Sequence, residues 1–201
     1  YFPDVNYVGV GEAASLVKGM ITIGERLAVL KDEATKKAAI YFLSPLETGI
    51  DLSPKTYPVT ESIFNAGCES PYACMTFFDD PLFLSKDGVF GISKLDLSSE
   101  RAVSHRSTTI NKLLCGIDRS GTLPYMARWD GYLLLLVNGE MFLADSRQKY
   151  LNKATQSVEY EWYYWTHIGA FRAGVFAKAT SLYSFKDYNS LLNYYLYDEI
   201  D

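Results

Sequence analysis

The chain has few of the features that mark membrane, metal or disulfide proteins. Its runs of consecutive apolar residues are short, such as the five residues Leu133–Val137, whereas a membrane-spanning helix needs roughly 20. The three cysteines, Cys68, Cys74 and Cys115, include no CxxC pair, which indicates free thiols in a reducing compartment rather than a disulfide framework. The formal net charge is −5, which argues against a nucleic-acid-binding surface built from bulk positive charge.

The sequence also offers little for catalytic chemistry. Its two histidines, His105 and His167, lie in unrelated contexts, and no HxxxH pattern or Cys/His group is present. Residues 9–14 match a GxGxxA pattern, but no strand-helix-strand context supports a dinucleotide site, and there is no GxSxG nucleophile motif. We therefore predict no enzyme activity, no catalytic residue, no cofactor or cofactor-binding residue, and no metal ligand.

Aromatic residues, by contrast, are abundant and favour a β-rich fold. Tyr, Phe and Trp make up 15% of the chain, with 14 glycines between them. Two segments, 74–92 and 126–144, share a hairpin design in which apolar runs alternate with turn signals. The predicted turns are 79–81 and 86–88 in the first segment, and Asp130–Gly131 and Asn138–Gly139 in the second. Gly88 and Gly139 are 51 positions apart.

Weaker copies of this hairpin lie on either side. Residues 20–42 contain a turn signal at Gly24–Glu25, and residues 174–185 form another candidate. Hairpins thus recur about once per 50 residues, which is typical of the four-stranded blades of a β-propeller. We predict an all-β fold, an antiparallel β-propeller or propeller fragment with about four blade-like units. Because the chain begins at Tyr1 without a secretory signal pattern, residues 1–201 are expected to be a single propeller-like domain of a longer protein.

Two stretches interrupt the hairpin rhythm. Prolines and Gly49 predict a loop over residues 45–60, because proline supplies no ladder donor and restricts the residue before it. Residues 98–114 predict a short helical insertion, since residues 98–100 precede apolar residues that are separated by polar ones. A strand at Thr108–Ile110 is the alternative there.

The segment 159–167 is the most distinctive local feature, because it carries five large rings. Alternation along a strand places Tyr160, Trp162 and Tyr164 on one face, with Tyr163 and Trp165 on the other. Exposed rings would form a platform for stacking sugars, whereas buried rings would pack a strand between neighbouring sheets. Each blade of a propeller covers both faces of its neighbour, so the packing interpretation is favoured.

Acidic residues leave one catalytic alternative open. A glycosidase needs two carboxylates about 5 to 10 Å apart. The candidates are Asp79, Asp80, Asp145, Glu159 and Glu161. A structural role is favoured, because acidic residues at turns cap backbone groups and those at strand ends pair with nearby arginines such as Arg147. A carbohydrate-binding or glycoside-hydrolase-like propeller module is the competing hypothesis.

Several stretches carry a resemblance to a protein family. They are residues 81–90 (PLFLSKDGVF), Glu100–Arg101, Arg106–Ser107, Ile110–Asn111, Trp129–Tyr132, Val137–Gly139, Asp145–Arg147 and Tyr160–Trp165. Over roughly residues 75–200 the chain resembles tailed-bacteriophage and prophage structural proteins. It is similar to the propeller-forming DNA-stabilisation proteins that close the neck of short-tailed phage particles. The resemblance brings no catalytic residues.

The resemblance implies a non-enzymatic virion structural component at the head–tail neck or the tail, assembled in the bacterial host cytoplasm. Its implied partners are other virion proteins and further copies of the chain, and no membrane. Contact with nucleic acid would need a local patch, for which the candidates are Arg101, His105, Arg106, Lys112 and Arg119. As ordinary surface residues these need no such role. An intracellular bacterial adaptor propeller without a phage connection is a third hypothesis.

The segment 191–197 is rich in strand-forming rings and predicts an edge strand near the end of the chain. Unpaired strand edges invite association. We therefore expect this strand to pair with another copy or to exchange its amide hydrogens readily, unless residues 5–10 complete its sheet.

Overall fold

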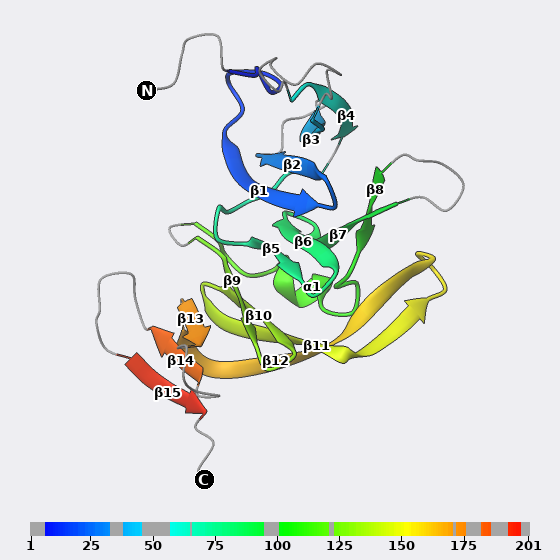
Figure 1. The fold of residues 1–201 in the computed structure, drawn as a ribbon. Coiled ribbons are helices and arrows are strands. Elements are labelled where there is room, and N and C mark those ends of the chain that lie inside the picture. The colour runs from blue at the N-terminus through cyan, green and yellow to red at the C-terminus, as the bar shows by residue number, and fades with distance from the viewer. Residues whose placement is uncertain are drawn as a thin grey trace.

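Strands dominate the fold, which is described here from a computed structural model (Figure 1). The structure describes residues 7–32, 38–45, 57–64, 66–94, 101–120, 123–170, 172–175, 182–185 and 193–197. Within these residues the strands form four antiparallel sheets, accompanied by one short helix. The predicted all-β class with about four sheet units is therefore confirmed. The described sheets do not close into a propeller ring.

Each sheet is a meander, in which strands that follow one another in sequence are paired. The first sheet contains β1 (Val17–Ile23), β2 (Arg26–Lys31), β3 (Ala38–Leu43) and β4 (Val59–Phe64). The second contains β5 (Cys74–Phe77), β6 (Asp80–Ser85), β7 (Gly88–Lys94) and β8 (Arg101–His105). Helix α1 (Asn111–Leu114) follows, and then the third sheet, with β9 (Tyr125–Trp129), β10 (Tyr132–Val137), β11 (Gly139–Asn152) and β12 (Ser157–Ala170). The fourth contains β13 (Arg172–Val175), β14 (Leu182–Phe185) and β15 (Asn193–Tyr197).

Two-residue turns set the register of the third sheet. Asp130 and Gly131 have φ angles of 36° and 82°, and Asn138 and Gly139 have 48° and 84°. Positive φ at both central residues is the requirement of a type I′ hairpin turn, which Asn or Asp followed by Gly meets at least cost. The strands accordingly pair directly across each turn, for example Val137 with Glu140. The predicted turns of this segment are confirmed.

Gly88 and Gly139 occupy equivalent places in successive sheets, as their spacing predicts. Gly88 begins β7 and Gly139 begins β11, and each of these strands is the third of its sheet. The weaker hairpins are also present, since β1 pairs with β2 across Gly24–Glu25 and β13 pairs with β14. That the sheets are related by rotation about a common axis stays a prediction.

The turn predicted at 79–81 lies slightly earlier in the chain. Phe78 and Asp79 form it, and Pro81 lies inside β6. Proline is tolerated at this place because the pairing of β6 with β7 begins only at Leu82. The missing N–H of Pro81 therefore removes no hydrogen bond between β6 and β7.

The short helix predicted within residues 98–114 is present only in the last part of this segment, and most of its described residues have another structure. Residues 101–105 form β8, whose pairing with β7 satisfies the backbone N–H and C=O groups that a helix would otherwise pair internally. The helix is confined to Asn111–Leu114, and Thr108–Ile110 form a turn rather than the alternative strand. Residues 98–100 lie outside the described residues.

The loop predicted over residues 45–60 ends earlier than expected. Val59 and Thr60 belong to β4, and Val59 pairs with Leu43 of β3. The strand begins directly after Pro58, which is consistent with the rule that proline stands at a strand's start rather than within it. Residues 46–56 lie outside the described residues.

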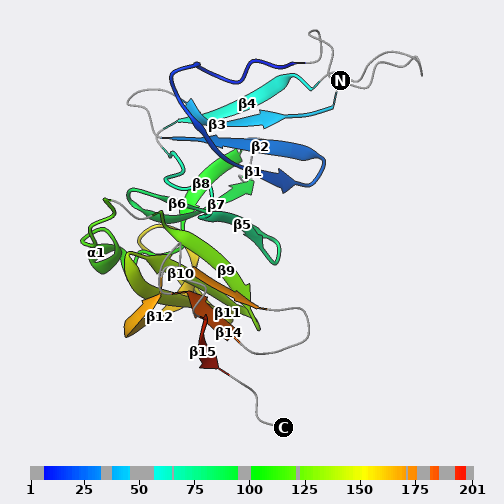
Figure 2. The same ribbon diagram turned by 90° about the vertical axis from the view of Figure 1, so that its left-hand side faces the viewer.

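The four sheets are stacked in chain order. Figure 1 shows them one above another, from the first sheet at the top to the fourth at the bottom, and Figure 2 shows them as successive layers from the side. Equivalent strands meet, because β1 contacts β5, β5 contacts β9 and β9 contacts β13. On the other side β4 contacts β8 and β8 contacts β12. Each sheet therefore lies on the next with first strand against first strand.

The second and third sheets bury side chains on both faces. In β6, Leu82 and Leu84 face the third sheet, whereas Phe83 faces the first. In β10, Leu133 joins the same cluster as Leu82, and Leu134 joins a cluster on the opposite face. Strands covered on both faces need apolar residues at every position, which explains why these two read as continuous apolar runs.

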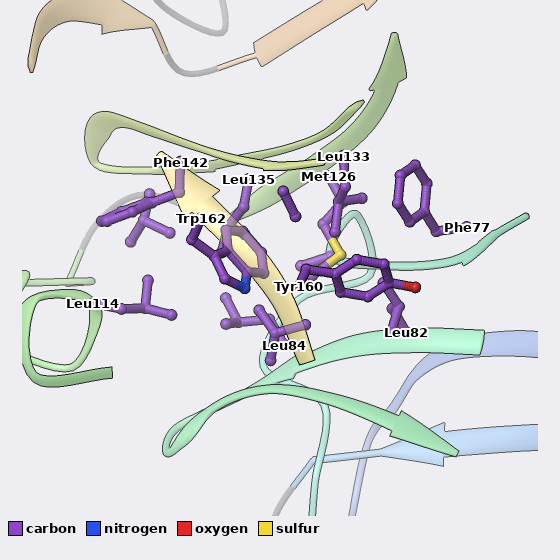
Figure 3. Close-up of a cluster of buried hydrophobic side chains, with 14 residues drawn as sticks. Phe77, Leu82, Leu84, Leu114, Met126, Leu133, Leu135, Phe142, Tyr160 and Trp162 are labelled. Atoms are coloured by element: carbon purple, nitrogen blue, oxygen red, sulfur yellow. The ribbon is translucent and has the colours of Figure 1, made fainter. Parts of the chain in front are cut away.

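The largest cluster of buried side chains lies between the second and third sheets, and we call it the central cluster. Its buried members are Ala73, Phe77, Leu82, Leu84, Val89, Leu114, Met126, Leu133, Leu135, Val137, Phe142, Ala144, Tyr160 and Trp162. Figure 3 shows Tyr160 and Trp162 of β12 between the leucines of β6 and those of β10. Each fully buried large side chain stabilises the fold by about 1.5–3 kcal/mol, so this layer holds the two sheets together.

The strand predicted within residues 191–197 is present as β15, which pairs with β14. Residues 191 and 192 lie outside the described residues. β15 is the last strand in the order β13-β14-β15. Its association with another copy or its rapid hydrogen exchange stays a prediction.

Candidate functional site

A charged network joins the second sheet to the third beside the central cluster, and we call it the interlayer network. Arg106, which follows β8, donates from Nε to Asp80 Oδ2 at 2.7 Å and from Nη2 to Oδ1 at 3.2 Å. The Tyr160 hydroxyl, from β12, donates to the same Asp80 Oδ2 at 2.9 Å. Gly91 leaves the necessary space, because a Cβ there would lie 2.7 Å from Asp80 Oδ1. The Asp80 carboxylate thus accepts hydrogen bonds from residues of both the second and the third sheet.

The two charged side chains of this network are largely buried. The side chains of Arg106 and Asp80 are only 9% and 17% exposed, so solvent screens their attraction little. The Trp162 indole Nε1 donates to the Arg106 backbone carbonyl at 2.7 Å, which ties the residue to β12 a second time. Burial raises the pKa of Tyr160 far above its usual value, and the negative charge of Asp80 raises it further. The phenol is therefore held as a neutral donor.

Glu159, the neighbour of Tyr160 on β12, is fully buried and receives several hydrogen bonds. The backbone N–H and the hydroxyl of Thr108 donate to it at 2.9 and 2.7 Å, and Asn152 Nδ2 donates at 2.8 Å. Thr155 adds a hydroxyl at 3.2 Å. These neutral donors stabilise the carboxylate and attach the turn after β8 to the long β11–β12 hairpin. A substrate cannot reach a carboxylate that is fully enclosed.

The other carboxylates weighed for sugar chemistry have simpler surroundings. Asp145 accepts from Arg147 Nε at 3.0 Å, so the predicted pairing of these two residues is confirmed. The hydrogen bond from Arg147 lowers the pKa of the Asp145 carboxyl below its usual value. Glu161 and Asp79 are exposed, on a strand and at a turn respectively. The structure thus brings Asp80 to Arg106 rather than to a second catalytic carboxylate.

The rings of β12 divide into buried and exposed groups. Tyr160 and Trp162 are buried, so the packing interpretation is confirmed for them. Tyr163 and Tyr164 are exposed, and burial on both faces is therefore wrong at these positions. The reason is that β12 is the last strand of its sheet, where rings reach solvent at the edge. Their hydroxyls donate to neighbouring side chains, Tyr164 to Glu140 at 2.7 Å.

The side chains of four of the five residues considered for a nucleic-acid patch are described, and these four do not form one cationic surface. Arg106 is buried and forms an ion pair with Asp80, and Arg119 forms an ion pair with Glu69. His105 packs its ring against Phe90, with the ring centres 4.2 Å apart. Lys112 is exposed, and the side chain of Arg101 lies outside the described part of the chain. Nucleic-acid contact stays a prediction.

A pocket of about 350 Å³ lies where the connections between sheets meet, and no sequence pattern indicated it. It is lined by Lys18, Asp32, Gly67, Cys68, Glu69, Lys86, Arg119, Leu123 and Pro124. These residues are spread over more than a hundred positions of the chain, on strand ends, turns and linkers. Such a site follows from how the sheets stack, so no local pattern could have found it.

The remaining sequence patterns have structural explanations. Residues 9–14 lie in bends and turns rather than between a strand and a helix, so the GxGxxA match is not a phosphate loop. Among the described residues, no group of three or more His, Cys, Asp and Glu side chains is placed to hold a metal ion. Likewise, none of the helical structure described here is long and apolar enough to cross a membrane. The side chain of His167 lies outside the description.

Comparison of the chain with protein-family models and with curated protein sequences gave no match. A function can therefore be inferred only from the geometry of the chain itself, and the phage resemblance remains a prediction.

Proposed function

We propose that the chain is a non-enzymatic scaffold of the β-propeller type that acts through protein–protein contact. The support is the stacking of four meander sheets with first strand against first strand, the relation that successive blades have in a propeller. Following the resemblance, we place this role in a tailed-phage or prophage virion, at the head–tail neck or the tail. The virion proteins around it and further copies of the chain would be its partners.

The main support for the proposal is that the buried charged groups connect one sheet to another. Asp80 and Arg106 join the second sheet to the third, and Glu159 joins the turn after β8 to the third sheet. A catalytic carboxylate needs access to a substrate, whereas these are enclosed and hydrogen-bonded. Their arrangement favours a rigid stack whose function lies in its outer surfaces.

The carbohydrate alternative would require exposed rings on β12 rather than buried ones. A sugar platform needs adjacent exposed rings beside two accessible carboxylates. Tyr160 and Trp162 are buried in the central cluster, and Asp80 is bound by Arg106 and Tyr160. Tyr163 and Tyr164 are exposed, but neighbouring residues of a strand point to opposite faces, so these two rings do not form one platform. The scaffold is therefore the better supported function.

The test is the composition and form of the particles made by the encoding phage or prophage. Peptides of this chain are expected in particles purified by density, and deletion of its gene is expected to leave heads without a complete neck or tail in electron micrographs. Complementation with the exposed-residue variant Asp79→Ala should restore normal particles, whereas Asp80→Ala, which breaks the interlayer network, should restore them poorly. Complete, infectious particles that lack the chain would overturn the proposal, and glycan binding or glycoside turnover by the pure protein would favour the alternative.

A further inference from the structure

Two of the three thiols lie side by side at the junction of the first and second sheets. Cys68 stands in the linker after β4, and Cys74 begins β5. Both belong to the apolar cluster between the two sheets, and their sulfurs are close enough for the Cys68 thiol to donate to Cys74 when Cys74 ionises. They also contact successive carbonyls of the intervening turn, Cys68 donating to Ser70 O at 3.2 Å and Cys74 to Pro71 O at 3.8 Å. The turn between them thus brings the two thiols close together.

The two sulfurs have different surroundings. Cys68 is fully buried, and the adjacent Cys74 sulfur together with this burial raises the pKa of its thiol. Cys74 is half-buried, and the hydrogen bond from Cys68 lowers the pKa of its thiol, with help from the backbone N–H of Met20. Gly19 of β1 makes room for Cys74, because a Cβ at that position would collide with its sulfur. Cys74 is thus the more accessible thiol and the one with the lowered pKa, whereas Cys68 is sheltered and has the raised pKa.

We propose that Cys68 and Cys74 form a dithiol that hydroperoxides oxidise to an intramolecular disulfide, a modification site in the linker between the first two sheets. An ionisable, accessible thiol beside a second thiol is the arrangement found at peroxide-sensitive cysteines. This inference is independent of the virion role, since it concerns the chemistry of the linker alone.

The reaction proceeds in two steps. The Cys74 thiolate attacks one oxygen of the peroxide, the O–O bond breaks, and the leaving hydroxide or alkoxide takes a proton, which gives a sulfenic acid at Cys74. The Cys68 sulfur then attacks the Cys74 sulfur, the S–O bond breaks, and the departing hydroxide takes the Cys68 proton as water. The two thiols lose two electrons to the peroxide, and with hydrogen peroxide two waters form.

The third cysteine provides an internal control. Cys115 is exposed and donates to the Lys86 carbonyl at 3.3 Å, so it is open to reagents but belongs to a different part of the fold. Hydrogen peroxide added to the full chain, followed by alkylation and intact-mass measurement, should remove two of the three alkylatable thiols. Peptide mapping should locate the disulfide between Cys68 and Cys74, with Cys115 still alkylated. A dithiol reductant should restore all three thiols.

Single variants separate the two roles. In Cys68→Ser the sulfenic acid at Cys74 lacks its partner and should be captured by a 1,3-dione probe. In Cys74→Ser the buried thiol is left alone, and its oxidation should be at least about tenfold slower than that of the wild-type pair. In Cys115→Ser disulfide formation should be unchanged. Retention of all three thiols in the wild-type chain, or loss of Cys115 first, would overturn the proposal, and neither readout depends on whether a variant folds.

Discussion

The interlayer network predicts that replacing Asp80 by alanine strongly destabilises the protein. Replacing it by alanine removes the carboxylate that Arg106 and Tyr160 share, and leaves a buried guanidinium and a buried hydroxyl without their acceptor. Breaking a buried ion pair by removing one partner costs about 3–5 kcal/mol, and an orphaned hydroxyl adds about 1 kcal/mol. Because both charged side chains are less than one-fifth exposed, little of this cost is relieved by solvent.

Asp79→Ala is the matched control. Asp79 is the same residue type one position earlier, but it is exposed at the turn before β6. Exposed substitutions of this kind change stability by less than about 0.5 kcal/mol. In urea unfolding, a loss of about 4 kcal/mol with a slope of about 2 kcal/mol per molar moves the midpoint of Asp80→Ala down by about 2 M. The midpoint of Asp79→Ala should stay close to that of the wild type.

A double-mutant cycle tests whether the shared acceptor is the cause. Tyr160→Phe should cost about 1.5–3 kcal/mol in the wild type, where its hydroxyl has a charged acceptor. In the Asp80→Ala background the same substitution removes an orphaned hydroxyl, so it should cost nothing and regain about 1 kcal/mol. Equal effects of Tyr160→Phe in both backgrounds would refute the reasoning. So would an Asp80→Ala variant no less stable than Asp79→Ala.

Three further predictions concern the same region. Gly91→Ala should destabilise the protein by about 1–3 kcal/mol, because its Cβ would lie 2.7 Å from Asp80 Oδ1 and 2.8 Å from Arg106 Cζ; Gly9→Ala, with nothing within 4 Å, should not, and equal midpoints in thermal unfolding would contradict the steric argument. Glu159→Ala should cost about 3 kcal/mol, since each orphaned buried donor costs about 1–3 kcal/mol, whereas the exposed neighbour in Glu161→Ala should leave urea unfolding within about 0.5 kcal/mol of the wild type. Because the pKa of Tyr160 is raised in the folded state, its contribution is complete below the usual tyrosine pKa near 10 and is lost above it by about 1.4 kcal/mol per pH unit; the stability difference between wild type and Tyr160→Phe should therefore shrink from pH 10 to 11, and a constant difference would show that the phenol is not protected.

The turns of the third sheet could be predicted because their cause is local. Asp130–Gly131 and Asn138–Gly139 adopt positive φ at both residues, and few dipeptides do so at low cost. The strand β8 was missed because its five residues, Arg-Ala-Val-Ser-His, do not alternate between polar and apolar and suit more than one structure. Pairing with β7 decided it, and a pairing partner is not visible within five residues of sequence.

The contacts of the candidate site likewise divide into local contacts, which could be predicted, and long-range contacts, which could not. The pairing of Asp145 with Arg147 spans two positions and was predictable from their order in the chain. The bond from Tyr160 to Asp80 spans 80 positions, and that from Thr108 to Glu159 spans 51. Such partners are chosen by how one sheet lies on the next, which depends on the whole stack rather than on any segment.

The meander topology has a consequence for synthesis of the chain on the ribosome. Each sheet is made from consecutive strands and contacts the sheet that precedes it. At roughly 5–20 residues per second, the next sheet follows after several seconds, whereas a hairpin forms within about 10 μs. Every sheet thus has time to form as it emerges, and it finds the apolar face of its predecessor already in place. The nascent chain can assemble layer by layer in the order in which it is translated.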